Sequence, residues 1–208
     1  MYIPHHFQFK NPLEKIAFMK QNSFATIITS INNIPFATQL PFDIDDSRDK
    51  PILCSHFAVS NKQAEYIEEN TSLVIFSGPH GYISPVHYDK NENVPTWDYI
   101  SVHAYGKAKI ISEEWEKEKV LEKMIRFYEQ NYLTQWKNLS DKYKKGMMKG
   151  IIAFEMEITD LQGIKKLSQN RTDNERMKIV RHLNNSNDTT EQELAKHIEG
   201  ISKDKNRN

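Results

Sequence analysis

The stretch from Val74 to Gly106 reads VIFSGPHGYISPVHYDKNENVPTWDYISVHAYG and is rich in turn-forming and aromatic residues. It holds three prolines, three histidines, four tyrosines and a tryptophan between two apolar runs with the composition of β-strands. Proline and glycine can fix the shape of a loop even where its backbone is irregular. We therefore expect the middle of this stretch to be a rigid, ring-rich loop that holds a planar ligand.

Short β-branched and aromatic runs on both sides of this stretch predict further strands. Asn32 and Asn33 tolerate positive φ, so they predict a hairpin turn between the first two strands. Gly106 is expected to form a bulge within a long strand. The predicted strands cover residues 24–29, 34–42, 52–57, 73–76, 99–111 and 151–158.

Helices are predicted between and after these strands. Asn11, followed by Pro12 and then Glu14, is typical of a helix start. Ser112 is expected to cap a helix whose apolar residues recur at helical spacing. Thr190 opens a capping-box pattern for a terminal helix that Gly200 is expected to close. The predicted helices cover residues 11–22, 64–70, 112–132, 136–149, 172–183 and 190–200.

Strands separated by turns, with a few inserted helices, indicate a mainly β, α+β chain built on a small antiparallel barrel. The chain has neither GxGxxG nor GxxxxGK[ST], so a doubly wound nucleotide-binding fold is not indicated. We expect a barrel domain with inserted helices over residues 1–162. A C-terminal motif and helical appendage is expected over 163–200, and a disordered tail over 201–208.

Composition narrows the function classes. The 208 residues carry 28 Lys and Arg against 28 Asp and Glu, so binding to DNA would need a local basic patch. The single cysteine, Cys54, excludes an internal disulfide framework. We see neither a basic-then-apolar leader nor an apolar run long enough to span a bilayer, so the expected location is cytoplasmic, without membrane contact.

Two groups of polar residues are candidates for ligand binding. Ser60, Asn61 and Lys62 lie between a strand and a predicted helix, where they fit either a phosphate site or an ordinary helix cap. The segment from Lys165 to Arg171 is rich in hydrogen-bond donors. It fits either a solvated basic loop or the edge of a heteroaromatic ring and its ribityl hydroxyls.

The ring-bearing residues also allow alternatives. Trp97 is either a core anchor or a stacking wall for a flat ring. The spacing of His80, His87 and His103 matches no zinc pattern, so no metal is predicted and hydrogen-bonded histidines are favoured, with haem ligation by one of them as the alternative. Cys54 lies in an apolar run, which favours a buried thiol over a nucleophile.

Three motifs, GPHGYISPVHY, VPTWDYISVHAYG and KLSQNR, follow one another along the chain and are preceded by SHFAVSNKQ. Together they resemble the PaiB-type family of FMN-binding proteins, described as negative transcriptional regulators, over roughly residues 1 to 175. The resemblance implies a split β-barrel related to the pyridoxamine-phosphate-oxidase and flavin-reductase-like proteins. It also implies a homodimer that binds FMN at the subunit interface.

The resemblance assigns roles to several positions. It places the FMN phosphate near the strand and turn that carry His56, Ser60, Asn61 and Lys62. It places His103 on a flavin-contacting strand, and it makes the KLSQNR segment a flavin or substrate contact. With His80 and Trp97 of the ring-rich loop included, the candidate cofactor-binding residues are His56, Ser60, Asn61, Lys62, His80, Trp97, His103, Gln169, Asn170 and Arg171.

The chain departs from related oxidases in one respect. Those proteins usually surround the phosphate with arginines, whereas the matching residues here are His, Ser, Asn and Lys. Lysine is a point charge without the planar fork of arginine. Low FMN affinity, or a different ligand in this site, is the expected consequence.

The leading hypothesis is a homodimeric FMN-binding transcriptional regulator. No helix-turn-helix pattern supports direct DNA binding, although the basic segments 142–149 and 165–181 could form a patch across a dimer. The second hypothesis is a flavin-dependent oxidoreductase or a haem-binding or haem-degrading enzyme on the same barrel. A dimeric scaffold without a cofactor is the third.

Overall fold

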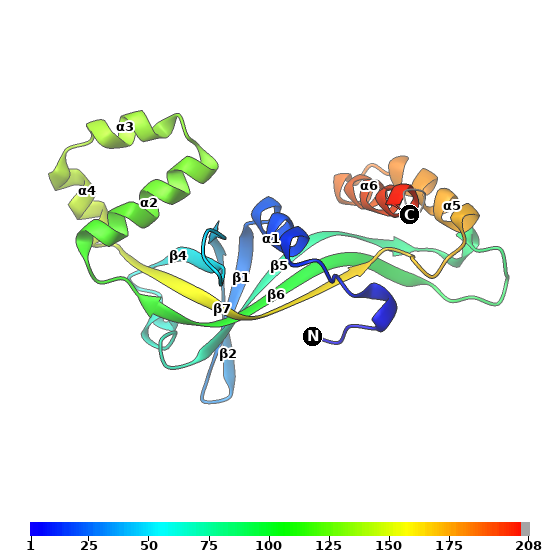
Figure 1. Cartoon of the computed structure of the whole chain (residues 1–208), viewed down its shortest axis with the longest axis horizontal. Helices are drawn as coiled ribbons and strands as arrows, with labels where there is room; N and C mark the ends of the chain where they lie inside the picture. The colour runs from blue at the N-terminus through cyan, green and yellow to red at the C-terminus, as the bar shows by residue number, and fades with distance from the viewer. Residues whose placement is uncertain (205–208) are drawn as a thin grey trace. The chain divides into compact units, whose positions relative to one another are not determined.

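The computed structural model describes residues 1–204, which form a seven-stranded sheet with helices at its periphery (Figure 1). The strand order is β2-β1-β5-β6-β7-β4-β3, and each pair with a resolved register is antiparallel. The strands are β1 (Phe24–Ile31), β2 (Ile34–Pro41), β3 (Asp43–Asp45), β4 (Ile52–Ala58), β5 (Thr71–Ile83), β6 (Thr96–Ile110) and β7 (Ile151–Lys166).

Six α-helices and three short 3₁₀ helices accompany the sheet. The α-helices are α1 (Pro12–Gln21), α2 (Glu114–Tyr128), α3 (Tyr132–Asn138), α4 (Asp141–Met148), α5 (Asp173–Asn184) and α6 (Thr189–Asp204). The 3₁₀ helices are η1 (His5–Phe7), η2 (Lys62–Glu65) and η3 (Pro85–His87).

The chain forms two compact units that are interleaved along the sequence. Among the described residues, one unit comprises 1–11, 77–102 and 162–204, and the other comprises 12–76 and 103–161. We refer to them as the C-terminal unit and the barrel unit. The predicted domain division at residue 162 stays a prediction. Part of the predicted tail, residues 201–204, is helical in α6, and residues 205–208 lie outside the described chain.

Aromatic packing forms the centre of the barrel unit. The ring of Phe42 lies 5.9 Å from that of Phe76 and 6.3 Å from that of Phe154, both in edge-to-face geometry. Phe154 also stacks on Phe57 with ring centroids 5.0 Å apart. All four side chains are fully buried. Because aromatic side chains bury large areas, this cluster contributes strongly to the apolar core of the unit.

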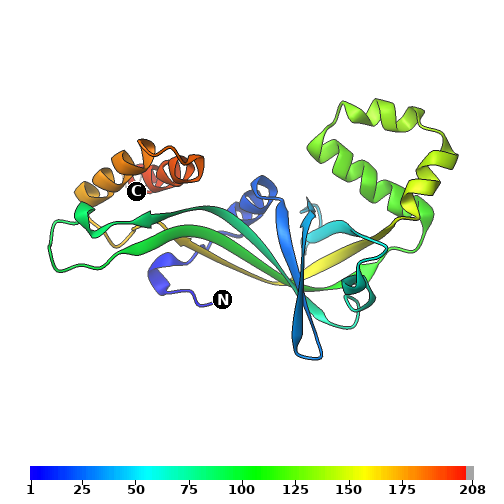
Figure 2. The same cartoon turned by 180° about the vertical axis from the view of Figure 1, so that it is seen from behind.

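The predicted hairpin turn is confirmed. Asn32 and Asn33 have φ of 51° and 64°, and β1 and β2 pair directly on either side of them (Figure 2). A two-residue turn with both φ positive matches the right-handed twist of the strands that it joins.

The loop predicted in the middle of the Val74–Gly106 stretch is present but shorter than expected. β5 continues through Gly78 and Pro79 to Ile83, and only residues 84–95 connect it to β6. Strand β1 pairs with β5 only as far as Ile75, so beyond that residue β5 has one strand partner fewer. Proline is tolerated at such an edge because no neighbour needs its missing N–H group.

Other predicted boundaries also shift. The N-cap of α2 is Glu113, so Ser112 does not cap this helix. Ser112 lies in the short connection after Ile111, whose N–H donates to the carbonyl oxygen of Ala153. Gly200 lies inside α6 rather than at its end. The helix predicted over residues 64–70 is only the 3₁₀ turn η2, and the last strand continues past residue 158 to Lys166.

Gly106 lies in β6 where another backbone comes very close. A Cβ atom on this residue would lie 2.2 Å from the carbonyl oxygen of Glu157 in β7. Gly146 in α4 has nothing within 4 Å of the same position. A side chain is therefore excluded by the neighbouring strand at Gly106 but has free space at Gly146.

We expect Gly106→Ala to destabilise the protein by at least about 2 kcal/mol, because the neighbouring strand must move to admit the methyl group. Gly146→Ala, the matched control, should stabilise it by up to about 1 kcal/mol, since alanine is the better residue inside a helix. Urea unfolding of both variants measures this. A Gly106→Ala variant as stable as the parent would contradict the close backbone approach.

Candidate functional site

In the C-terminal unit, alternate side chains of β5 point to opposite faces of the strand. Pro79, Gly81 and Ile83 are buried, whereas His80 and Tyr82 are exposed. A Cβ atom on Gly81 would lie 3.0 Å from Leu194 of α6, so the buried face is the one covered by helices (Figure 1). The period of two along a strand therefore sends His80 and Tyr82 to the uncovered face.

Trp97 of β6 meets these two side chains. Its ring centroid lies 5.7 Å from that of His80 and 6.3 Å from that of Tyr82. Trp97 is 53% exposed, which excludes its interpretation as a core anchor within the described chain. A hollow of about 380 Å³, which we call the aromatic hollow, is lined by Ser77, Gly78, His80, Trp97, Tyr99, Ile100 and Ser101.

The end of β7 holds the backbone of Trp97. Lys166 donates from Nζ to the carbonyl oxygen of Trp97 at 2.7 Å and also to Oγ1 of Thr96. Lys166 is thus committed to the protein rather than free for solvent or ligand. The basic part of the KLSQNR motif serves here to place the tryptophan.

Asp98, next to Trp97, points to the opposite, buried face. It is fully buried, and its Oδ2 accepts a hydrogen bond of 2.6 Å from Ser168. Burial raises the pKa of Asp98 to about 6, although Ser168 and the cations Lys166 and Arg171 lower it in part. Ser168, which makes this contact, has a positive φ of 57°. Sequence reasoning missed Asp98, because no local pattern marks a carboxylate that will be buried.

The three candidates that follow Ser168 have different surroundings. Gln169 accepts from Leu167 N at 2.8 Å and donates to Lys165 O at 2.5 Å, so its amide closes the turn after β7. Arg171 lies 3.6 Å over the ring of Tyr88 and donates to Asn93 Oδ1 at 3.0 Å. Asn170 is exposed. A flavin contact by any of them stays a prediction.

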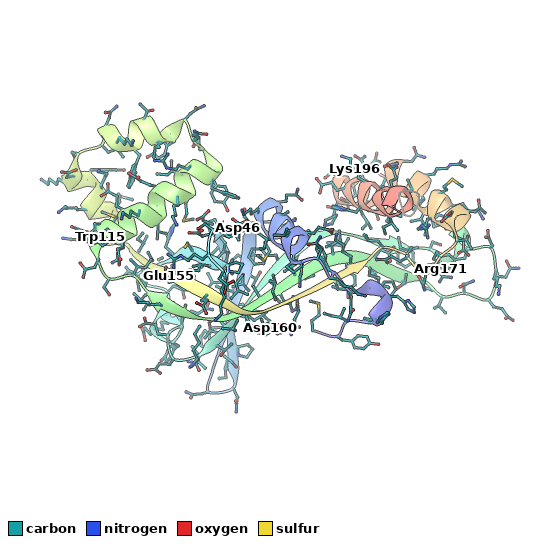
Figure 3. All side chains as sticks on the ribbon, in the orientation of Figure 1. Asp46, Trp115, Glu155, Asp160, Arg171 and Lys196 are labelled. Atoms are coloured by element: carbon teal, nitrogen blue, oxygen red, sulfur yellow. The ribbon has the colours of Figure 1, made fainter. Side chains whose placement is uncertain are left out.

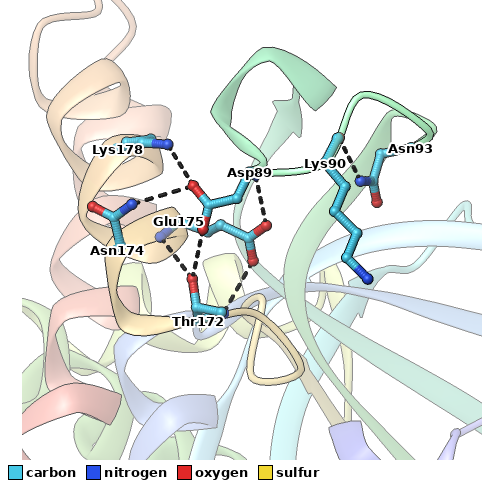
Figure 4. A network of polar contacts seen from close by, with 7 residues as sticks. All are labelled: Asp89, Lys90, Asn93, Thr172, Asn174, Glu175 and Lys178. Atoms are coloured by element: carbon cyan, nitrogen blue, oxygen red, sulfur yellow. Dashed lines mark hydrogen bonds and ion pairs between the residues drawn. The ribbon is translucent and has the colours of Figure 1, made fainter.

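The connection between β5 and β6 is fastened to α5 by a polar network (Figure 4). Asp89 accepts from Lys178 at 2.7 Å and from Asn174 at 3.2 Å, and its backbone N–H donates to Glu175 at 2.9 Å. Glu175 and Thr172 also form the capping box of α5. These contacts join segments more than 80 residues apart, so the sequence analysis did not predict them.

In the barrel unit, Asn61 acts as a helix cap. Its side chain accepts from Gln63 N at 3.0 Å at the start of η2 and donates to Thr38 at 3.0 Å. Gln63, buried, continues this network to Thr29 and to Ile27 O. The helix-cap interpretation is therefore confirmed for Asn61. The side chains of Ser60 and Lys62 are exposed and make no hydrogen bond within residues 1–204, so they remain free to bind an anion.

His56 and His103 are half-buried, and each has a buried Nδ1 atom without a partner among residues 1–204. Burial lowers the pKa of both imidazoles, so both are neutral at pH 7. The sheet does not bring them together. His56 pairs with Ala153 of β7, and the carbonyl of Ala153 accepts from Ile111 N, so Ile111 marks the level of His56 at the end of β6. His103 lies eight residues before Ile111, which is roughly 26 Å along an extended strand.

Two further sequence questions concern metal and thiol chemistry. Within the described residues, no group of three or more His, Cys, Asp or Glu side chains is arranged to hold a metal ion. Cys54 is buried, and burial raises the pKa of its thiol to about 12, which agrees with the buried-thiol interpretation.

No helix of the described chain combines the length and the apolar character that crossing a membrane requires.

Solved structures share the fold. The flavocytochrome Anf3 from Azotobacter vinelandii superposes with a TM-score of 0.62 at 14% identity, covering 77% of this chain and 70% of that one. The FAD and heme binding protein from Mycobacterium smegmatis gives 0.60 at 12% identity, with 76% and 73% covered. The fold is thus the predicted antiparallel split β-barrel with peripheral helices.

Sequence comparison identifies the family. Residues 1–160 match the model described as "Putative FMN-binding domain". The protease synthase and sporulation protein PAI 2 of Bacillus subtilis is 37% identical over 202 residues, covering 96% of this chain and 97% of that protein. The uncharacterized protein AN0679 of Emericella nidulans is 30% identical over 209 residues, with 84% and 82% covered. The chain therefore belongs to the PaiB-type family of FMN-binding domains.

The raised pKa of Asp98 predicts a pH-dependent stability. An aspartate in the unfolded chain titrates near 4, so the folded protein binds an extra proton between about pH 4 and about pH 6. The stabilising contribution of neutral Asp98 is complete below about pH 4 and is lost as the pH rises through about 6.

Asp98→Asn keeps a neutral side chain at every pH, so relative to the parent it should gain about 2 kcal/mol between pH 4 and pH 7. Ser168→Ala removes a hydrogen bond that favours the carboxylate and should move the parent's transition to higher pH. Urea unfolding across this pH range measures both effects. Parallel pH profiles for Asp98→Asn and the parent would contradict the argument.

Proposed function

We propose that this chain is a homodimeric FMN-binding protein of the PaiB type that acts in negative transcriptional regulation. Its membership of the family of FMN-binding domains supports the choice of cofactor. The observation that carries the proposal is the aromatic hollow, in which Trp97 is half exposed beside His80 and Tyr82.

The aromatic hollow fits a flat ring system. An exposed indole offers a large rigid face for stacking, and the bond from Lys166 to the carbonyl oxygen of Trp97 holds the backbone that carries it. Because the tryptophan is held before a ligand arrives, little conformational freedom is lost on binding. FMN, when bound, supplies one- and two-electron redox chemistry, and the residues of the chain bind and orient its ring.

Donors for a phosphate group are also present. Ser60 and Lys62 are exposed at the N-terminus of η2, and in the same segment of the chain His56 carries an Nδ1 atom that has no partner in the described part of the protein. One lysine without an arginine makes this a weaker anion site than a bidentate one. A modest affinity for FMN follows.

The placement of the candidate residues supports a homodimer. His56 and His103 lie far apart along the sheet of one chain, and the aromatic hollow is open on its uncovered face. A second copy of the chain would supply the missing wall and bring further donors to the ligand.

The charge distribution bears on how a regulatory role would be exerted. Several cations of the two basic segments are already paired: Lys144 with Glu118, Lys145 with Glu114, and Lys178 with Asp89. Paired cations release fewer counterions on binding phosphates, which lowers the expected affinity for DNA. We therefore propose that DNA binding, where it occurs, depends on the dimer rather than on one chain.

A second function has specific support in the exposed imidazole of His80 beside Trp97. Two of the structural neighbours are named as a flavocytochrome and a FAD and heme binding protein. A flavin-dependent oxidoreductase or a haem protein on the same barrel would use this histidine. NAD(P)H oxidation with added FMN, and a Soret band on haem addition that His80→Ala abolishes, distinguish it from the regulator.

Trp97→Ala should weaken FMN binding at least about tenfold, because it removes a stacking face worth about 1.4 kcal/mol. The free energy of unfolding should change by less than about 1 kcal/mol, since the ring is largely exposed. Trp115→Ala is the matched control: Trp115 is equally exposed on α2 but outside the hollow, and its loss should leave FMN affinity unchanged.

Fluorescence titration of FMN with urea unfolding of the same samples measures both quantities. Equal weakening by the two tryptophan variants would exclude the aromatic hollow as the ring site. If the parent protein does not bind FMN, FMN is excluded as its cofactor.

Analytical ultracentrifugation and DNA retardation test the remaining parts of the proposal. We expect a dimer at micromolar concentration and retardation of the DNA upstream of the protein's own gene that falls steeply with added salt. A stable monomer would contradict the dimer, and retardation absent at every salt concentration would contradict direct repression.

A further inference from the structure

The barrel unit contains a second hollow, which we call the basic pocket. It lies between α2 and the strands β4, β6 and β7, with a volume of about 260 Å³. Figure 3 shows Trp115 on α2 and Glu155 on β7 at this end of the unit. The aromatic hollow belongs to the C-terminal unit and shares no residue with the basic pocket.

Charged side chains dominate the rim of the basic pocket. Four are cationic and two are anionic: Arg48, Lys109, Lys119, Lys123, Glu116 and Glu155. Lys123 is committed to Asp45, with Nζ and Oδ2 2.8 Å apart. In the described chain, Arg48 and Lys109 form no ion pair. The rim therefore keeps an excess of positive charge in a protein whose formal net charge is zero.

Trp115 places one of these cations. The ammonium group of Lys119 lies over the indole ring, 4.2 Å from its centroid, because residues four positions apart on a helix are neighbours on its surface. A cation held on an aromatic face loses less freedom when it binds an anion than a lysine in solvent does. Trp115 is thus a positioning residue for Lys119.

The floor of the pocket is uncharged. It consists of Cys54, Ile111 and Val120, which belong to the apolar cluster that packs α2 against the sheet. The thiol of Cys54 is buried at the floor and stays protonated at neutral pH, because burial raises its pKa to about 12. A neutral, apolar floor adds no charge that would offset the rim cations.

We propose that the basic pocket binds a small organic anion that also carries hydroxyl or ammonium donors, either a phosphate ester or a carboxylate. Lys109, Lys119 and Arg48 would bind the anionic group, and Glu116 and Glu155 would accept from the donors. The volume lies below the roughly 300–1,000 Å³ of pockets for drug-sized ligands, which suits a metabolite of a few carbon atoms rather than FMN or haem.

Occupancy of the basic pocket would connect α2 to the strands beneath it. The ligand would contact α2 through Lys119 and Glu116, and the sheet through Lys109 and Glu155. A ligand that binds only the folded protein raises its stability according to its concentration. A rise in melting temperature with ligand is therefore expected together with binding.

Calorimetric titration of the full-length protein with inorganic phosphate, ribose 5-phosphate and glutamate tests the proposal. Binding of ribose 5-phosphate and phosphate identifies a phosphate ester as the ligand class, and binding of glutamate alone identifies a carboxylate. The absence of saturable binding by all three probes would overturn the proposal.

Variants locate the binding. Lys119→Gln and Lys109→Gln should each weaken the binding of the probe at least about tenfold, a loss of about 1.4 kcal/mol in binding free energy. Lys117→Gln changes the charge by the same amount on the same helix but outside the pocket lining, and it should have no effect. Equal weakening by all three variants would show only general attraction to positive charge and would reject the site. FMN titration of the same variants should match the parent, so failure here is separable from failure of the proposed flavin site.

Discussion

The alternation of side chains along β5 and β6 is the constraint on which the candidate flavin site depends. Neighbouring residues of a strand point to opposite faces, so the register that buries Asp98 under the helices also exposes Trp97. A shift by one residue would bury the tryptophan and expose the carboxyl group. The apolar packing of Gly81 and Ile83 against the helical face thus determines indirectly which rings a ligand meets.

Polar contacts between distant segments then fix details that apolar packing leaves open. Ser168 bonds to Asp98, Lys166 bonds to the backbone of Trp97, and Glu175 bonds to the backbone of Asp89. Each contact satisfies a group that burial or a loop conformation would otherwise leave unpaired. Asp98 is the exception: its Oδ1 has no partner among residues 1–204, and burial raises its pKa, so folding favours its neutral form.

The two units carry different kinds of ligand chemistry. The C-terminal unit offers aromatic rings on an uncovered strand face, which suits a flat cofactor. The barrel unit offers a small pocket with a cationic rim and a neutral floor, which suits a compact anion. A protein with no net charge can hold both, because each depends on a local arrangement and neither on the total charge.

By itself the sequence determined the Asn32–Asn33 turn, through residues that tolerate positive φ, and the split-barrel class and the family, through the resemblance of its motifs. Only the tertiary structure decided that Asn61 is a helix cap joined to a buried network, that Trp97 is exposed, and that His56 and His103 lie apart. The reason is range: turns and caps depend on residues a few positions apart, whereas the bond from Ser168 to Asp98 spans 70 positions and exists only after the strands pair in register.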